Sequence, residues 1–111
     1  MIIVAVVYDR SDMIECVSVS GHASGLKKGG NIVCAAVTAL VRTAARLLEE
    51  LPGVDVSGGP GERGEFELCV DVVDKRRVEY VKAVGDYLIT GIKDLRDEFP
   101  DDCLIEEKQR R

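Results

Sequence analysis

The chain opens with two short stretches whose apolar residues are arranged as in β-strands. Residues 2–8 are apolar and largely β-branched, residues 9–12 form a polar turn, and residues 13–20 place valines at alternate positions. Alternation with a period of two puts one face of a strand in the core and the other in solvent. The pattern therefore predicts an opening β-hairpin.

A glycine-rich segment follows this hairpin. Residues 21–30 read Gly-His-Ala-Ser-Gly-Leu-Lys-Lys-Gly-Gly, with four glycines in ten residues. Glycine adopts backbone angles that other residues avoid, so the segment is too permissive for a strand or a helix. We expect a mobile surface loop here.

Apolar side chains then recur at helical spacing from Val33 to Leu51, and a Pro-Gly pair ends the pattern. Asn31 is a favourable N-cap, because its side chain can accept a hydrogen bond from a backbone N–H of the first turn. The pattern predicts a helix over roughly residues 32–51.

The second half of the chain repeats this order of elements. Residues 54–57 and 64–72 predict a second hairpin with one buried and one wet face. Residues 75–98 have apolar side chains at helical spacing and predict a second long amphipathic helix. The pair Phe99-Pro100 ends it, because the residue before a proline is disfavoured in a helix.

These elements fit one small domain. Hairpin strands with one wet face and two covering helices, in the order ββαββα, predict an α+β fold with an antiparallel four-stranded sheet and two helices packed on it. The charged tail, residues 101–111, is either a short edge segment or a frayed end. Because 111 residues suffice for one core, we expect a single domain over residues 1–111.

Composition and charge narrow the class of protein. Apolar residues make up 46% of the chain and charged residues 32%, which suits a globular protein rather than a disordered or membrane chain. The first apolar run meets Asp9 and Arg10 too soon for a signal peptide or a membrane span, so we expect a cytoplasmic protein. A net charge of −5 argues against direct binding to nucleic acid through a basic surface.

The four cysteines, Cys16, Cys34, Cys69 and Cys103, lack Cys-x-x-Cys spacing and the density of a disulfide-stapled domain. In a reducing compartment they should be free thiols. Because the chain has one histidine and no pair of cysteines at ligand spacing, we expect no metal site and no cofactor.

Cys34 and His22 are a candidate nucleophile and base. Cys34 lies in the predicted first turn of the helix, where unpaired backbone N–H groups and the helix dipole favour the thiolate. His22 is on the glycine-rich segment, and a loop returning to the helix start can bring the two side chains together. Alternatively, Cys34 is a small core residue and His22 a surface or capping residue. The glycines of this segment favour the catalytic interpretation, since the backbone of a peptide substrate laid against the helix needs room without side chains.

The residues around this pair resemble the signature of the ribosomal-processing cysteine protease family. They read Gly-His-Ala at 21–23 and Gly-Gly-Asn-Ile-Val-Cys-Ala-Ala-Val-Thr-Ala-Leu at 29–40. The element order, the length and the aromatic-Pro end of the second helix also match, so the likeness covers nearly the whole chain. The resemblance implies a homodimeric α+β endopeptidase that removes a short N-terminal extension from a large-subunit ribosomal protein. Cleavage in that family follows an aromatic pair and precedes a small residue.

Position by position, the resemblance implies that Cys34 is the nucleophile and His22 the base. The residues expected in the substrate loop are Gly21, Ala23, Gly29 and Gly30. Two positions depart from the usual family pattern: Asn31 stands in place of Asp, and Thr38 in place of Ser. Thr38 keeps the hydroxyl, and Asn31 can still act as an orienter of the histidine or as a helix cap without a charge. We expect activity to survive.

The expected mechanism starts when His22 takes the proton of Cys34 and the thiolate attacks the scissile carbonyl. Backbone N–H groups at the helix start would meet the oxyanion, and water would release the acyl-enzyme. One alternative is a non-catalytic ribosome-associated module that holds a peptide or RNA in the same loop. Another is a thiol redox protein, which would need a resolving cysteine near Cys34, and none lies within fifteen residues in the sequence.

Overall fold

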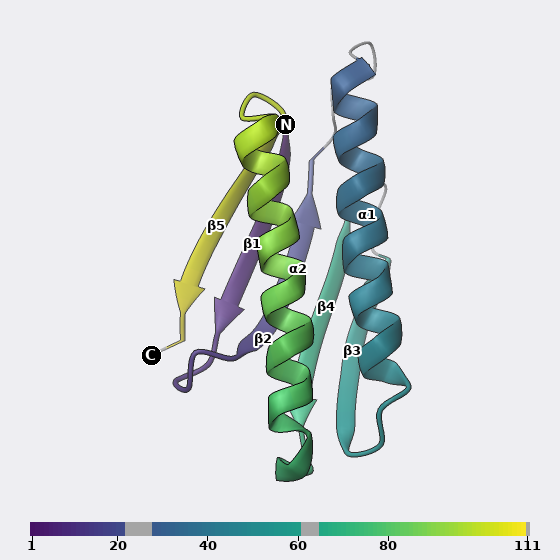
Figure 1. The fold of residues 1–111 in the computed structure, drawn as a ribbon, viewed down its shortest axis with the longest axis vertical. Coiled ribbons are helices and arrows are strands. Elements are labelled where there is room, and N and C mark those ends of the chain that lie inside the picture. The colour runs from purple at the N-terminus through teal and green to yellow at the C-terminus, as the bar shows by residue number, and fades with distance from the viewer. Residues whose placement is uncertain (22–27, 61–64, 111) are drawn as a thin grey trace.

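The computed structural model describes residues 1–21, 28–60 and 65–110, with the backbone alone for residues 28–31. These residues form a sheet on which two long helices pack (Figure 1). The elements are β1 (Ile2–Tyr8), β2 (Ile14–Ser20), α1 (Lys28–Glu49), β3 (Val54–Pro60), β4 (Phe66–Val72), the 3-10 helix η1 (Lys75–Arg77), α2 (Val78–Glu98) and β5 (Cys103–Gln109). The two expected hairpins and the two expected helices are present.

The sheet has five strands in the order β3-β4-β2-β1-β5. The pairs β1–β2, β2–β4 and β3–β4 are antiparallel, but β5 pairs in parallel with β1, from Ile2↔Cys103 to Tyr8↔Gln109. The expected antiparallel four-stranded sheet is therefore wrong, because the sheet is five-stranded and mixed. The reason is that α2 returns the chain along the sheet from β4, as a crossover helix between parallel strands does, so that the tail becomes an edge strand.

The core lies between one face of the sheet and the two helices, which cover the same face (Figure 1). Val33, Val37 and Val41 of α1 are at most 1% exposed, and they pack with inward residues of β1 and of α2. In the described part of the chain no helix covers the other face of the sheet. The fold is thus a two-layer α+β sandwich whose helical layer carries the candidate nucleophile.

Helix α1 begins earlier than the sequence pattern predicts. Its first residue is Lys28, so Gly29 and Gly30 lie in its first turn and Asn31 is its fourth residue. The expected loop is wrong over residues 28–30, and the expected N-cap role of Asn31 is wrong as well. Each glycine costs a helix only about 1 kcal/mol relative to alanine, which the packing of the following turns can offset.

The edge strand β5 is held to its neighbours by polar side chains as well as by its ladder. The hydroxyl of Tyr8 donates a 2.6 Å hydrogen bond to Oε1 of Glu107, and Nζ of Lys93 on α2 lies 3.2 Å from the same oxygen. Burial and the neighbouring Glu107 raise the pKa of Tyr8, while the bond from Tyr8 lowers the pKa of Glu107. These contacts join β1, β5 and α2 at one end of the sheet.

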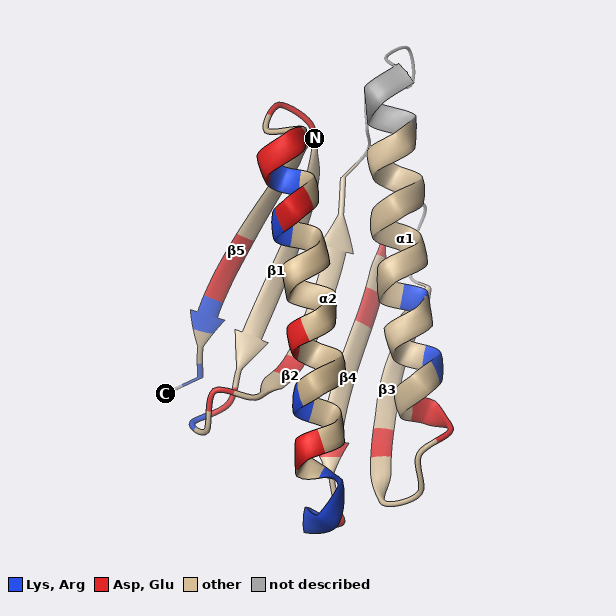
Figure 2. Cartoon of the chain, in the orientation of Figure 1, with Lys and Arg blue, Asp and Glu red and all other residues tan. Residues whose placement is uncertain are grey.

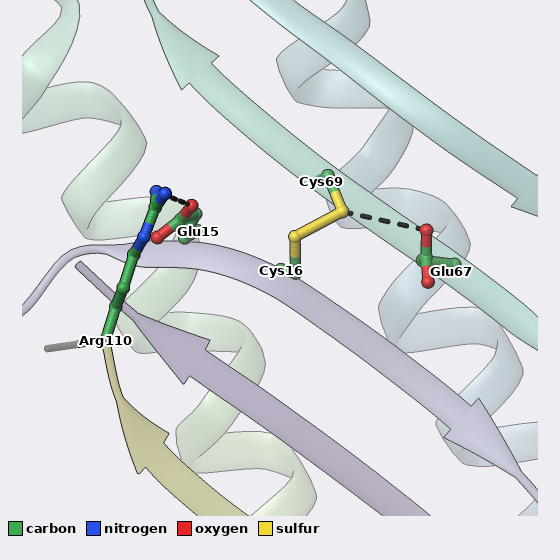
Figure 3. Close-up of a disulfide and its surroundings, with 5 residues drawn as sticks. All are labelled: Glu15, Cys16, Glu67, Cys69 and Arg110. Atoms are coloured by element: carbon green, nitrogen blue, oxygen red, sulfur yellow. Dashed lines mark hydrogen bonds and ion pairs between the residues drawn. A yellow bond between two sulfur atoms is a disulfide. The ribbon is translucent and has the colours of Figure 1, made fainter.

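A disulfide between Cys16 and Cys69 joins β2 to β4 (Figure 3). The two residues are directly opposite each other in the ladder, with their Cα atoms 4.1 Å apart. Four free thiols were expected, and for this pair that expectation is wrong. The two positions are 53 residues apart in the sequence, so only the pairing of the strands reveals that they are neighbours.

The disulfide should make a large contribution to stability. Replacing both Cys16 and Cys69 by serine removes a cross-link that closes a long loop in the unfolded chain, and we expect the free energy of unfolding to fall by about 2–4 kcal/mol. Urea unfolding followed by circular dichroism measures this change. The parent in excess dithiol should match the double variant, and a parent whose urea midpoint is the same with and without dithiol would contradict the prediction.

Candidate active site

Cys34 is an exposed free thiol that lines a cavity of about 290 Å³ between α1 and the sheet. The residues that line this cavity are Ile2, Val19, Gly21, Cys34, Val37, Thr38, Arg42, Pro60, Glu65 and Phe66. We call it the Cys34 cavity. An exposed thiol at the wall of a cavity is accessible to a bound substrate, so the alternative of Cys34 as a core residue is wrong.

The Cys34 cavity has an apolar sheet wall and a helical wall with polar side chains. On the sheet side, Val19 of β2 and Phe66 of β4 are cross-strand partners. On the helix side, Cys34, Thr38 and Arg42 follow one another at steps of four residues, a spacing that aligns side chains along one face of a helix. The cavity therefore offers an apolar surface opposite a row of a thiol, a hydroxyl and a guanidinium.

The position of Cys34 along α1 differs from the expected one. Because the helix starts at Lys28, Cys34 is its seventh residue and lies in the second turn. Only the first four N–H groups of a helix lack partners, and the effect of the dipole falls off within the first turn. The expected activation of Cys34 by the helix end, and the expected oxyanion site there, do not fit this geometry.

Gly21 places the chain at the cavity directly after β2. Its φ is +87°, a value that favours glycine, and a Cβ at this position would collide with the carbonyl oxygen of Met1. The next residues, His22 and Ala23, lie outside the described residues, and so does the side chain of Asn31. The pairing of His22 with Cys34 therefore stays a prediction.

The other cysteines differ from Cys34 in chemistry. Cys16 and Cys69 are joined to each other, and Cys103 is buried, which raises the pKa of its thiol.

Over the described ranges, no group of three or more His, Cys, Asp or Glu residues could hold a metal ion. None of the helices in the described part is long and apolar enough to cross a membrane.

Sequence reasoning missed two charged residues of this site, Arg42 and Glu65. Arg42 lies eight residues after Cys34, and that spacing is the signal that could have found it, since it places both on one helix face. Glu65 comes directly before β4, and no spacing in the sequence links it to Cys34. Figure 2 shows how few charges the coloured part of α1 carries: the upper turns of this part are uncharged, and its basic positions lie in the lower half of the helix.

Comparison with protein families identifies the class of this protein. The family model of the cysteine protease Prp matches residues 1–104. The chain belongs to the cysteine protease Prp family. Its class is therefore that of a cysteine protease, a hydrolase, and the resemblance read from residues 21–40 is confirmed.

Solved structures share the fold of this Prp family member at low sequence identity. The crystal structure of SMU.848 from Streptococcus mutans has a TM-score of 0.81 and 23% identity, and the match covers 99% of this chain and 96% of that one. The essential ribosomal processing protease Prp from S. aureus, in complex with a covalently linked product peptide, has a TM-score of 0.82 and 16% identity, with coverage of 97% and 100%. Among curated proteins, no match was found.

Cys34 should be the thiol that reacts first in the folded protein. Because Cys34 is exposed and Cys103 is buried with a raised pKa, we expect iodoacetamide at pH 7 to label one residue per chain, Cys34. Peptide mapping by mass spectrometry measures the site and the rate of labelling. Cys34→Ser, as the control, should take up no label until the chain is unfolded, and labelling of Cys103 as fast as Cys34 would contradict the prediction.

Proposed function

We propose that this protein is an endopeptidase that removes a short N-terminal extension from a large-subunit ribosomal protein, cleaving after an aromatic pair and before a small residue. The observation that carries the proposal is the exposed thiol of Cys34 at a largely apolar cavity in a chain of the Prp family. The structures of the S. aureus ribosomal processing protease Prp, one with a covalently linked product peptide and one with a substrate peptide, support it. Such a substrate would place the protein in the cytoplasm.

In the proposed mechanism, His22 takes the proton of Cys34 and the thiolate attacks the scissile carbonyl. His22 follows directly after Gly21, which lines the Cys34 cavity, and this adjacency supports its role as the base. His22 then gives this proton to the amine, which leaves as the tetrahedral intermediate collapses to a thioester, and water hydrolyses the thioester and frees the thiol of Cys34. No cofactor is needed for any of these steps.

The oxyanion needs donors other than the backbone at the helix start. Around Cys34 the N–H groups of α1 lie within the helix, where they are engaged with carbonyl groups one turn earlier. Among the described residues of the cavity wall, Thr38 offers a hydroxyl one turn beyond Cys34. We assign Thr38 as a side-chain donor to the oxyanion, which gives the hydroxyl at this position a chemical use.

The apolar sheet wall suits the aromatic pair of the proposed substrate. Val19 and Phe66 present an apolar surface across the cavity from Cys34, and an aromatic side chain packed on Phe66 gains from both burial and ring contact.

Asn31 has a separate role in this proposal, which is to orient His22. It is one turn before Cys34 on α1, and it cannot act as the helix cap because the helix begins at Lys28.

The rival functions lose support from the same cavity. A thiol redox protein would need an accessible second thiol to resolve an oxidised Cys34. The remaining cysteines are either joined to each other or buried, so the structure offers none. A module that only holds a peptide or RNA would not require a nucleophile in its groove.

Peptide cleavage tests the proposed reaction. A synthetic extension peptide with an aromatic pair followed by alanine should be cut after the pair, and Cys34→Ala and His22→Ala should each lower kcat by at least about a thousandfold because a triad-like unit loses function when one member is removed. Mass spectrometry of the products measures the position and rate. Cys103→Ser keeps the candidate site and is the matched control.

The same assay tests the two supporting residues. Asn31→Ala should lower kcat sharply with the circular-dichroism spectrum unchanged, and Asn31→Asp should raise kcat above that of the parent. Thr38→Val should lower kcat by about ten- to a hundredfold, below the loss seen for a full oxyanion donor, because an exposed hydroxyl is a weaker donor than a buried one. Intact peptide after prolonged incubation with the parent would contradict the proposed reaction.

We propose in addition that the protein is a homodimer whose helical layer forms the interface. Between α1 and α2 lies an apolar groove of about 510 Å³, and three large side chains beside it are unusually exposed. Leu47 and Tyr80 are each 43% exposed, and Tyr87 is 74% exposed. A second copy that packs its own helices on this face would bury these side chains, as a twofold interface requires the same patch on both subunits.

A single charge in the groove should dissociate this dimer. Tyr87→Glu places a carboxylate where the proposed interface is apolar, and because Tyr87 is already exposed, the monomer should keep its fold. Sedimentation velocity measures the mass, which should halve relative to the parent. Val73→Glu is the matched control, since Val73 is 63% exposed and does not line the groove. A parent that sediments as a monomer would contradict the proposal.

A further inference from the structure

Arg42 is a charged residue of the Cys34 cavity that the proposed mechanism does not use. It lines the cavity together with Cys34 and Thr38. In the described ranges it has no ion pair and no hydrogen bond, although arginines elsewhere in the chain, such as Arg76 and Arg110, are paired with carboxylates. A guanidinium that has no partner among the described residues, beside a largely apolar cavity, can pair with a group of the substrate.

The distance between Arg42 and Cys34 defines which part of a substrate Arg42 can reach. The two residues are eight positions apart on one helix, so their backbones are about 12 Å apart along its axis. An extended peptide advances about 3.3 Å per residue. A substrate lying along α1 therefore passes Arg42 three or four residues away from the bond that Cys34 attacks. At that separation Arg42 cannot contact the oxyanion.

The chemistry of the surrounding cavity indicates what Arg42 binds. The sheet wall opposite is apolar, formed by Val19 and Phe66, and solvent screening is weaker beside such a wall than at an open surface. The carboxylate of Glu65 also lines the cavity, but it forms no ion pair with Arg42. A guanidinium pairs best with a planar carboxylate, through two parallel hydrogen bonds.

We propose that Arg42 is a specificity-determining residue that selects an acidic side chain three or four residues from the cleaved bond and disfavours a basic one there. This inference rests on the proposed function, because it assigns a role within the same cavity. It adds a second determinant to the aromatic pair. The aromatic residues would be recognised by the apolar wall, and the acidic residue by the basic position two turns along α1.

Charge-swapped peptides test the inference. Peptides with an aromatic pair and alanine at the centre carry Glu, Gln or Lys at the third or fourth residue on either side. For the variable residue on one side of the cleaved bond, we expect the parent to cleave the Glu peptide with a kcat/KM about five- to tenfold above that of the Lys peptide. The difference should lie mainly in KM. Arg42→Gln should remove this ratio, and Arg42→Glu should invert it.

Two controls separate a local effect from a general one. Arg46→Glu makes the same charge change one turn further along α1, at a residue that does not line the cavity, and should keep the parent ratio. Glu65→Gln should leave the ratio or increase it, because it removes the competing carboxylate. A ratio below twofold at every position, or an equal loss in Arg46→Glu, overturns the role of Arg42 and leaves the protease function intact.

A binding measurement keeps the inference testable without turnover. In the Cys34→Ala background, fluorescence anisotropy should show tighter binding of the labelled Glu peptide than of the Lys peptide, and Arg42→Glu in the same background should reverse the order. Equal affinities overturn the role of Arg42. Absence of cleavage by the parent, together with a clear binding preference, would instead contradict the proposed hydrolysis and uphold the selection by Arg42.

Discussion

The packing of α1 against the sheet determines where the polar side chains of the cavity's helical wall lie. Val33, Val37 and Val41 form the buried stripe of this helix. Each of the residues Cys34, Thr38 and Arg42 comes one position later, and one position is a rotation of about 100° around the helix axis. The valines fix the rotation of α1, and the polar row then faces the flank of the helix where the cavity is. A rotation of the helix by one residue would bury the thiol.

This constraint explains why part of the fold and of the site could be predicted from the sequence. The spacing of apolar residues from Val33 onward predicts the helix and its buried face. It also predicts that Cys34 lies beside that face, because Cys34 directly follows Val33. The hairpins are predicted by the alternation in residues 13–20 and 64–72. In each case the periodicity reports directly on burial, and burial dominates the energetics of these elements.

The errors have physical reasons of their own. The tail reads as charged because β5 is an edge strand, of which Cys103 alone is fully buried, so the period-two signal is weak. The disulfide depends on the register between β2 and β4, which no local pattern contains. The start of α1 was misplaced because glycine propensity is a weak preference that packing overrides, and that error also misassigned Asn31. In the proposed mechanism, activation of Cys34 accordingly comes from side chains around it rather than from the helix end.

The path of β1 has a practical consequence for handling the protein. Ile2, the second residue of the chain, lines the same cavity as Cys34, and the carbonyl of Met1 lies against Gly21. The end of β5 lies toward the opposite end of the sheet, where the C-terminus is seen in Figure 1. An affinity tag fused before Met1 would start at the rim of the Cys34 cavity, where it would lie close to the exposed thiol and could block access to it. Strand β5 ends at Gln109, opposite Tyr8 at the far end of β1, so a tag fused on the C-terminal side of β5 leaves the sheet away from that rim. The C-terminal side is therefore the better place for purification handles, fluorophores and surface tethers.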